Sequence, residues 1–289
     1  MATCDALAAL ITLQLITSQT FGQDKPCSSS TSWIFCPPDT DPTSSDVWFW
    51  FKNKEDGTRQ IHIECNSNSL PERYLAAFGR LKEGMSVTTL QLTGCPAPTK
   101  TFDTWLPKLG SPRGTLRKLR FLPNNETDKA TLRSEHFEGL ENLRTLEIWN
   151  SVETLGPELL KNLISLEKFK YDSGPALTSV HELAFKRNKN LWKIEIIQSG
   201  LSSIHKNTFK GLAKLEILDL SQNKITAIPQ ELLTDLTQLK ELILNQNSIS
   251  ELPPDLLLKN PNVTTFSASK LPQSKNLTAS RERSDNPAR

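Results

Sequence analysis

The stretch LEILDLSQNKI, residues 215–225, decides the fold of this chain. The residues that define the repeat are Leu215, Leu218, Leu220 and Ile225 at positions 1, 4, 6 and 11 of the stretch, and Asn223 at position 9. The same spacing returns 24 residues later in residues 239–249, and more weakly another 24 residues on, in residues 263–268. A pattern that recurs at a fixed period predicts a solenoid of stacked, similar units.

The frame extends toward the N-terminus through six earlier units. From last to first, these units begin at Leu191, Leu166, Leu143, Leu116, Val87 and Thr58. From the first unit to the ninth, the steps are 29, 29, 27, 23, 25, 24, 24 and 24 residues. No chance arrangement of leucines would hold such a period, so the repeats determine the architecture.

Each unit contains a short alternating segment of the form Leu-x-Leu, which predicts a β-strand with one buried face. The strands of successive units are expected to pair in parallel, and nine of them would span about 40 Å. The pattern is typical of leucine-rich repeats. It predicts an α/β solenoid, a leucine-rich repeat horseshoe with a parallel inner sheet. Three phenylalanines of the return segments are expected to fill its core: Phe137, Phe185 and Phe209.

The ninth position of each unit lies where the strand turns inward. An asparagine there can bond to backbone groups that would otherwise be buried without a partner. Asn124, Asn223 and Asn247 hold this place, and Asn66 holds it in the first unit. Other units have a different residue, which predicts irregular central repeats: Cys95, Ser151, Gly174 and Ser199.

Length and composition exclude several classes of protein. A chain of 289 residues suggests about two domains, but the repeat period favours one solenoid. The 34 basic and 32 acidic residues leave a net charge of +2, which argues against a nucleic-acid binder. The hydrophobic fraction of 37% with mixed charge permits a core. The 12 glycines are too few for a collagen-like or glycine-rich phosphate-binding design.

An apolar run at residues 6–17 has the length of a secretory signal, with cleavage expected before Gln23. The alternative is a buried N-terminal helix, because the segment before the run has no Lys or Arg and contains Asp5. No later stretch has 18 or more apolar residues, so the sequence predicts no membrane span in this chain.

Four cysteines remain after the leader, and secretion makes them candidates for disulfides. They are Cys27, Cys36, Cys65 and Cys95. Three pairings are open. Cys65 and Cys95 lie at corresponding ends of neighbouring predicted strands, roughly 4.8 Å apart, which favours their pairing and leaves Cys27 with Cys36.

An N-terminal cap is expected to cover the first repeat. The aromatic strand at residues 47–51 and the strand at residues 59–63 flank Asp56-Gly57, which predicts a hairpin. We interpret the aromatic run as a cover for the core rather than a ligand site. The predicted segments are a signal peptide (1–22), the cap (23–86), the repeats (87–271) and a disordered polar tail (272–289).

No cysteine cluster closes the C-terminal end, although a solenoid's last repeat exposes its core. Two explanations stay open. The chain is a fragment or a truncated gene product, or another surface covers the last repeat, which would allow oligomerisation through that end.

The cysteine frame resembles that of a known family. Cys36 precedes a proline, Cys65 precedes an asparagine, and Cys95 precedes a second proline just before the repeats. This arrangement is similar to the amino-terminal end of the ectodomain of insect Toll receptors, over roughly residues 24–271. Toll receptors have more repeats, a second cysteine-capped block, a membrane helix and a signalling domain, none of which is in these residues.

The resemblance implies an extracellular module of innate immunity or development that binds a Spätzle-type cystine-knot cytokine but cannot signal alone. Two alternatives stay open: a stand-alone secreted recognition or matrix-binding protein, and an adhesion ectodomain. The transcript downstream of Arg289 distinguishes them, because a receptor continues into further repeats and a membrane helix.

Ligand contacts are expected on the concave face, where side chains between the buried positions point to solvent. Large apolar groups at such positions are typical anchors of protein interfaces. The preferred anchors are Leu122, Trp149, Trp192 and Ile197, with Arg120 and Lys170 among their polar neighbours. The alternative is that scattered exposed hydrophobic residues have no role.

Three sequons predict glycosylation: Asn125, Asn262 and Asn276. The sequence indicates no enzyme, cofactor or metal site, because it contains no zinc motif, nucleophile elbow or P-loop. The four histidines are scattered over different repeats: His62, His136, His181 and His205. We interpret His181 and His205 as equivalent positions of the repeat.

Overall fold

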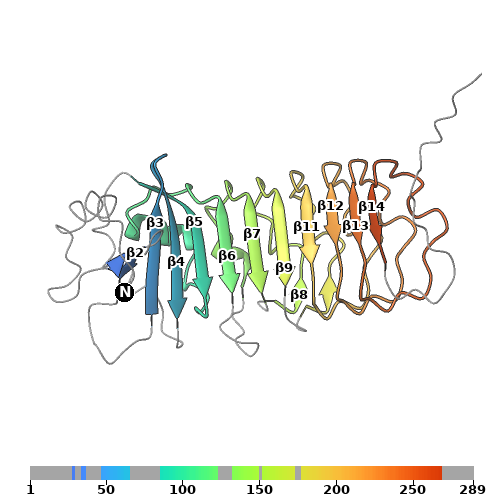
Figure 1. Ribbon diagram of the computed structural model, residues 1–289, viewed down its shortest axis with the longest axis horizontal. Coiled ribbons are helices and arrows are strands. Elements are labelled where there is room, and N and C mark those ends of the chain that lie inside the picture. Colours follow the sequence, from blue (N-terminus) through green and yellow to red (C-terminus); the bar gives the residue numbers. More distant parts are fainter. Residues whose placement is uncertain are drawn as a thin grey trace, which may run out of the picture.

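The computed structural model shows a solenoid whose strands lie side by side in one long sheet, with the return segments behind it (Figure 1). The predicted leader and polar tail, and Cys27, lie outside the part of the chain that the structure describes. That part comprises residues 28–29, 34–36, 47–65, 85–122, 132–149, 152–172 and 177–268.

The main sheet contains, within the described residues, twelve strands in chain order. The first three are antiparallel to their successors: β1 (Ser28–Ser29), β2 (Ile34–Cys36) and β3 (Val47–Asn53). The other nine are parallel: β4 (Thr58–Cys65), β5 (Ser86–Thr93), β6 (Lys118–Leu122), β7 (Thr145–Trp149), β9 (Lys168–Asp172), β11 (Lys193–Ile196), β12 (Ile217–Asp219), β13 (Glu241–Ile243) and β14 (Thr265–Ser267). The nine predicted units are confirmed.

Short segments return the chain from one strand to the next. Apart from turns they contain η2 (Phe102–Thr104), α3 (Trp105–Lys108), η3 (Ser134–Phe137) and the two-residue pair β8 (Thr154–Leu155) and β10 (Ser179–Val180). The regular structure of the solenoid is therefore mainly strand, with little helix in the described residues. None of these helices is long and apolar enough to cross a bilayer.

The core lies between the sheet and the return segments. Inward side chains of the strands are almost fully buried, as Leu146, Ile194 and Leu218 illustrate with 0% exposure. The predicted fillers Phe137, Phe185 and Phe209 are also buried. Phe185 packs between Phe169 and Phe209, with ring centroids 5.6 and 5.9 Å away, so aromatic rings of successive repeats form a continuous column.

Two sets of asparagines satisfy the backbone at the turns. Asn223 Nδ2 donates to the carbonyls of Ile196, Leu220 and Ser221, at 2.7 to 3.1 Å, as the pattern predicts. Asn247 makes the equivalent bonds to Leu220 and Leu244.

The return segments carry a second set that was not predicted from the sequence. Asn188 Nδ2 donates to Leu160 and Leu163, and Asn260 Nδ2 donates to Leu233 and Leu236. Their signal was present, because both asparagines stand at the same place in the repeat, three residues before the first leucine or valine of the unit.

The N-terminal hairpin is confirmed. Strands β3 and β4 pair from Val47 with Cys65 to Asn53 with Arg59. Gly57 turns the chain with φ of 77°, and Asp56 Oδ1 accepts the backbone N–H of Thr58 at 2.9 Å. Positive φ costs a residue with a Cβ more than glycine, which explains Gly57.

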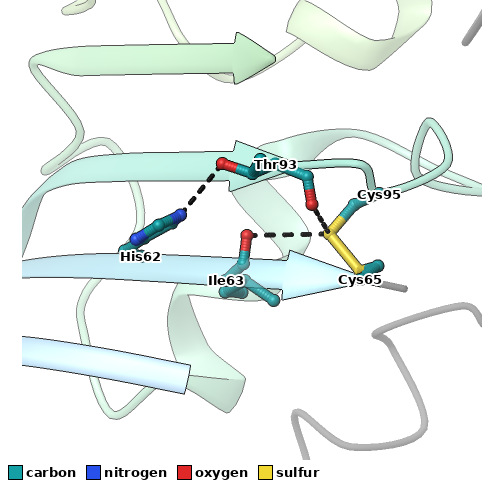
Figure 2. Close-up of a disulfide and its surroundings, with 5 residues drawn as sticks. All are labelled: His62, Ile63, Cys65, Thr93 and Cys95. Carbon is teal, nitrogen blue, oxygen red and sulfur yellow. Dashed lines mark hydrogen bonds between the residues drawn. A yellow bond between two sulfur atoms is a disulfide. The ribbon is translucent and has the colours of Figure 1, made fainter. Parts of the chain in front are cut away.

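The disulfide between Cys65 and Cys95 is also confirmed, and it links the end of β4 to the turn just after β5, with Cα atoms 4.9 Å apart (Figure 2). Next to this cap, Arg59 is 1% exposed and lies 5.4 Å from the ring centroid of Phe51. Its Nε donates to Asn53 Oδ1 at 2.7 Å. Burial lowers the pKa of Arg59, since the interior disfavours the charged form.

Candidate ligand-binding face

Alternation along the strands divides each of them into buried and solvent-facing residues, and the solvent-facing set forms the concave face. The register aligns one row of this face across nine strands, from the hairpin to β13. The row consists of Trp50, His62, Gln91, Arg120, Glu147, Lys170, Glu195, Asp219 and Ile243. All nine are half-buried.

Polar contacts connect the first part of this row into a ladder. His62 Nε2 lies 3.3 Å from Gln91 Nε2 and 2.9 Å from Thr93 Oγ1, the second of which Figure 2 shows. Gln91 Oε1 accepts a hydrogen bond from Arg120 Nη1 at 2.7 Å. Arg120 Nε in turn donates to Glu147 Oε2 at 2.7 Å. Contacts at every step fix the side chains before any ligand arrives.

Glu147 is the carboxylate of the ladder with which two cations form ion pairs. Besides Arg120 it pairs with Lys118, whose Nζ lies 2.5 Å from Oε1. Burial by itself raises the pKa of Glu147, but Lys118 and Arg120 outweigh it, so the pKa lies below its ordinary value. The carboxylate therefore stays ionised at neutral pH and holds both cations in place.

Lys170 continues the alternation of charge on β9. Its Nζ lies 2.8 Å from Asp172 Oδ2. Burial lowers the pKa of Lys170, but the nearby carboxylates of Asp172, Glu195 and Glu147 outweigh burial and raise it. Like Arg120, Lys170 is a fixed cation of the concave face.

Trp149 lies between these two cations at the end of β7. The Arg120 guanidinium carbon is 5.9 Å from the Trp149 ring centroid, and Lys170 Nζ is 5.5 Å from it. Cations over a ring face attract its quadrupole. All three residues were expected on the ligand-binding face, and the structure brings them together into one aromatic and cationic surface rather than a purely apolar one.

Trp192 lies apart from the other preferred anchors. It precedes β11, whereas Leu122 and Trp149 end their strands and Ile197 follows the end of β11. Because these strands are parallel, Trp192 lies where the strands begin, and the other three anchors lie where the strands end. Lys168 Nζ is 4.6 Å from its ring centroid. The four anchors therefore form two surfaces, with three residues at the C-terminal ends of the strands and Trp192 at the N-terminal ends.

One aromatic contact of the concave face was not predicted. Val47, Phe49 and Phe51 face the core, so half of the aromatic run covers the first repeat as expected. Trp50 faces the other way and stacks on His62, with ring centroids 4.8 Å apart. Burial, and then the charge of Arg120, lower the pKa of His62, which favours the neutral ring at physiological pH.

The other predicted sites are placed as follows. Asn262 is exposed, and its Nδ2 donates to Thr237 O at 3.2 Å. Asn125 and Asn276 lie outside the described residues, and so does the proposed partner of Cys36. Glycosylation and a Cys27–Cys36 disulfide therefore stay predictions.

The two return-segment histidines are structurally equivalent. His181 Nδ1 accepts the N–H of Leu183, and His205 Nδ1 accepts the N–H of Asn207. This agrees with their interpretation as repeat positions. Among the described residues, no group of three or more His, Cys, Asp or Glu side chains is arranged to hold a metal ion.

Comparison with known proteins supports the fold. Residues 130–264 match the family model of the BspA-type leucine-rich repeat region, in six copies. A chain from the Toll–Spätzle complex, described as a molecular hub in Drosophila development and innate immunity, has a TM-score of 0.61 and 17% identity, over 82% of this chain and 33% of that one. Its glycosylated form gives 0.60 and 18%, over 84% and 34%.

A chain from the complex of TLR13 with ssRNA13 has a TM-score of 0.56 and 20% identity, over 71% of this chain and 27% of that one. At these identities the likeness shows a shared fold alone. The present chain spans about a third of the length of these receptors. No curated protein matches it.

Proposed function

We propose that this leucine-rich repeat protein, whose fold is similar to that of Toll ectodomains, is an extracellular module that binds a protein ligand on its concave face. The observation that carries the proposal is the surface around Trp149, where an aromatic ring and two cations are fixed in place on neighbouring strands. Pre-organised aromatic and arginine side chains are the usual anchors of protein interfaces.

The candidate ligand is a Spätzle-type cystine-knot cytokine. The similarity in fold to a chain of the Toll–Spätzle complex supports this choice, as does the cysteine frame of the cap. In this proposal the chain recognises the ligand in innate immunity or development. It is a binding module rather than an enzyme.

The test is direct binding. The chain, secreted from insect cells, is immobilised, and the affinity of a Spätzle-type cytokine is measured by surface plasmon resonance. We expect specific binding that Trp149→Ala weakens by about tenfold or more, as is typical of an anchor residue. Leu258→Ala is the matched control, because Leu258 is 75% exposed on a return segment. No binding by the unaltered chain would exclude this ligand, and equal affinities of the two variants would exclude the Trp149 surface.

Extracellular location has an independent test. Asn262 is exposed and stands in a sequon, so secreted material should lose mass on endoglycosidase treatment. Asn262→Gln should reduce the shift. Retention of the chain inside the cell, without glycan, would contradict the proposed location.

A further inference from the structure

Charge is distributed unevenly along the concave face. Five cations lie on β6, β9 and β11: Lys118, Arg120, Lys168, Lys170 and Lys193. Three carboxylates lie among them: Glu147, Asp172 and Glu195. Beyond β11, strands β12 to β14 carry Asp219 and Glu241 and no cation. The face is therefore positive over β6–β11 and negative over β12 and β13.

The carboxylates hold the central cations in position without cancelling their charge. Glu147 is shared by two cations, and Lys193 Nζ lies 3.3 Å from Glu195 Oε1. Lys168 is exposed, and its described contact is with the ring of Trp192. The two tryptophans thus lie at opposite edges of one positive area, each beside a lysine.

We propose that this positive area docks an acidic segment of the protein ligand that also carries apolar side chains. The proposal rests on the proposed function and names the chemistry of its partner. Acidic side chains of the ligand pair with Lys168 and Lys193, and its apolar side chains pack on Trp149 and Trp192. The neutral or basic part of the ligand lies over β12 and β13, because complementary charge fixes the orientation of a complex.

A protein segment fits this surface better than a nucleic acid does. A polynucleotide has a phosphate at every step and would bring charge close to Glu147, Asp172 and Glu195, which lie among the cations. The excess over the four strands is only two positive charges, by the count of five cations and three carboxylates. A protein segment can space its acids to meet the lysines and place neutral side chains next to the carboxylates.

The experiment uses three labelled probes and fluorescence anisotropy. They are an acidic peptide of about 12 residues in which Asp and Glu alternate with Leu, the same peptide with Lys in place of the acids, and single-stranded RNA of equal length. When extended, such a peptide spans about 40 Å, enough to cross the positive area. We expect the acidic peptide to bind most tightly, and its affinity to fall as salt rises.

Charge reversal locates the site. The double variant Lys168→Glu with Lys193→Glu should lower the affinity for the acidic peptide by about tenfold, since each change replaces an attraction by a repulsion. Lys186→Glu with Lys210→Glu alters the net charge equally on exposed return segments and should change the affinity little. Glu241→Lys should strengthen binding, because it extends the positive area. Circular dichroism checks that each variant folds. If the charge-reversal variant of Lys168 and Lys193 does not fold, the double variant Lys168→Gln with Lys193→Gln is used instead.

Each contrary result overturns a definite part of the proposal. Equal weakening of peptide binding by the two double variants would show that the peptide does not bind at Lys168 and Lys193. Tighter binding of RNA or of the basic peptide would exclude an acidic protein segment as the partner. If the cytokine binds the chain but the acidic peptide does not, or if reversal of the two lysines leaves cytokine binding intact, this inference fails while the proposed function stands.

Discussion

The two halves of the solenoid build the same sheet by different means. In β4 and β5 the strands have eight residues each, and a disulfide ties their ends. In β12, β13 and β14 the strands have three residues each, and Asn223 and Asn247 tie the turns that follow. The C-terminal half uses the same asparagine contact at successive turns, whereas the N-terminal half is held together by contacts that occur once.

The concave face follows the same division. The polar ladder and the stacked Trp50 and His62 lie on β3 to β7. The last three strands instead show two isoleucines, two carboxylates and two hydroxyl groups: Ile217, Asp219, Glu241, Ile243, Thr265 and Ser267. Regular hydrogen bonding at the turns is enough to stabilise a repeat. The irregular half departs from this pattern where its concave face carries the specialised side chains, so we expect the anchoring contacts of the ligand on β6–β11, with only its neutral or basic part over β12 and β13.

The largest effect should come from the cap. Replacing Cys65 and Cys95 together by Ser removes a link between residues separated by 30 positions. Loss of such a constraint costs about 2–4 kcal/mol of unfolding free energy. Hydrogen exchange measured by mass spectrometry should show faster opening of β4 and β5 than of β12 and β13. Uniform acceleration along the chain would mean that the two halves unfold as one unit.

The C-terminal half should depend on its asparagines instead. Asn223→Leu removes three hydrogen bonds to buried carbonyls. Buried backbone groups left without partners cost about 1–3 kcal/mol. Urea denaturation measures the loss, with the exposed neighbour Gln222→Ala as control, expected to stay within about 0.5 kcal/mol. Similar stabilities of the two variants would show that water replaces the asparagine.

Glu147→Gln should have a smaller effect on stability. Its partners Lys118 and Arg120 are 38% and 33% exposed, so solvent screens the pairs and the loss should be below about 1 kcal/mol. Because the pKa of Glu147 is lowered by folding, its contribution is present above the pKa of the unfolded chain and disappears as the pH falls through the folded value. Thermal melts of both proteins should therefore converge in acid, and a constant difference at all pH values would contradict the ion pairs.

The smallest effect concerns His62. Its pKa lies below the ordinary value of 6.5, so the unfolded chain binds more protons in the window between the two values. The stability that neutral His62 provides is complete above pH 6.5 and is lost as the pH falls through the folded pKa. His62→Gln should therefore make stability less sensitive to pH in that window. The fluorescence of the stacked Trp50 should follow the same titration, and an identical pH profile in the variant would contradict the burial of this ring.

The sequence predicted the elements that follow from a period. The nine parallel strands and the Cys65–Cys95 disulfide depend on which positions are equivalent in successive repeats, and the hairpin follows from the local turn signal Asp56-Gly57. The buried Asn188 and Asn260 could also have been found in this way, by aligning the return segments.

The arrangement of the concave face was predicted only in part. Arg120, Trp149 and Lys170 are half-buried residues at solvent-facing positions of their strands, and their role in ligand binding stays a prediction. Their arrangement depends on the directions of long side chains, which no spacing specifies. The stacking of Trp50 on His62 depends on the register of β3 against β4. The separation of Trp192 from Trp149 was readable from their different positions in the unit, although the shared aromatic character suggested one cluster.

The most direct test is hydroxyl-radical footprinting of the chain alone and with a bound Spätzle-type cytokine. Trp149 and Trp192 should be oxidised less in the complex, whereas the buried Trp105 and the exposed Leu258 should be unchanged. This result would place the ligand over β6–β11 of the concave face. Protection confined to the return segments or to β12–β14, with both tryptophans still oxidised in the complex, would contradict it.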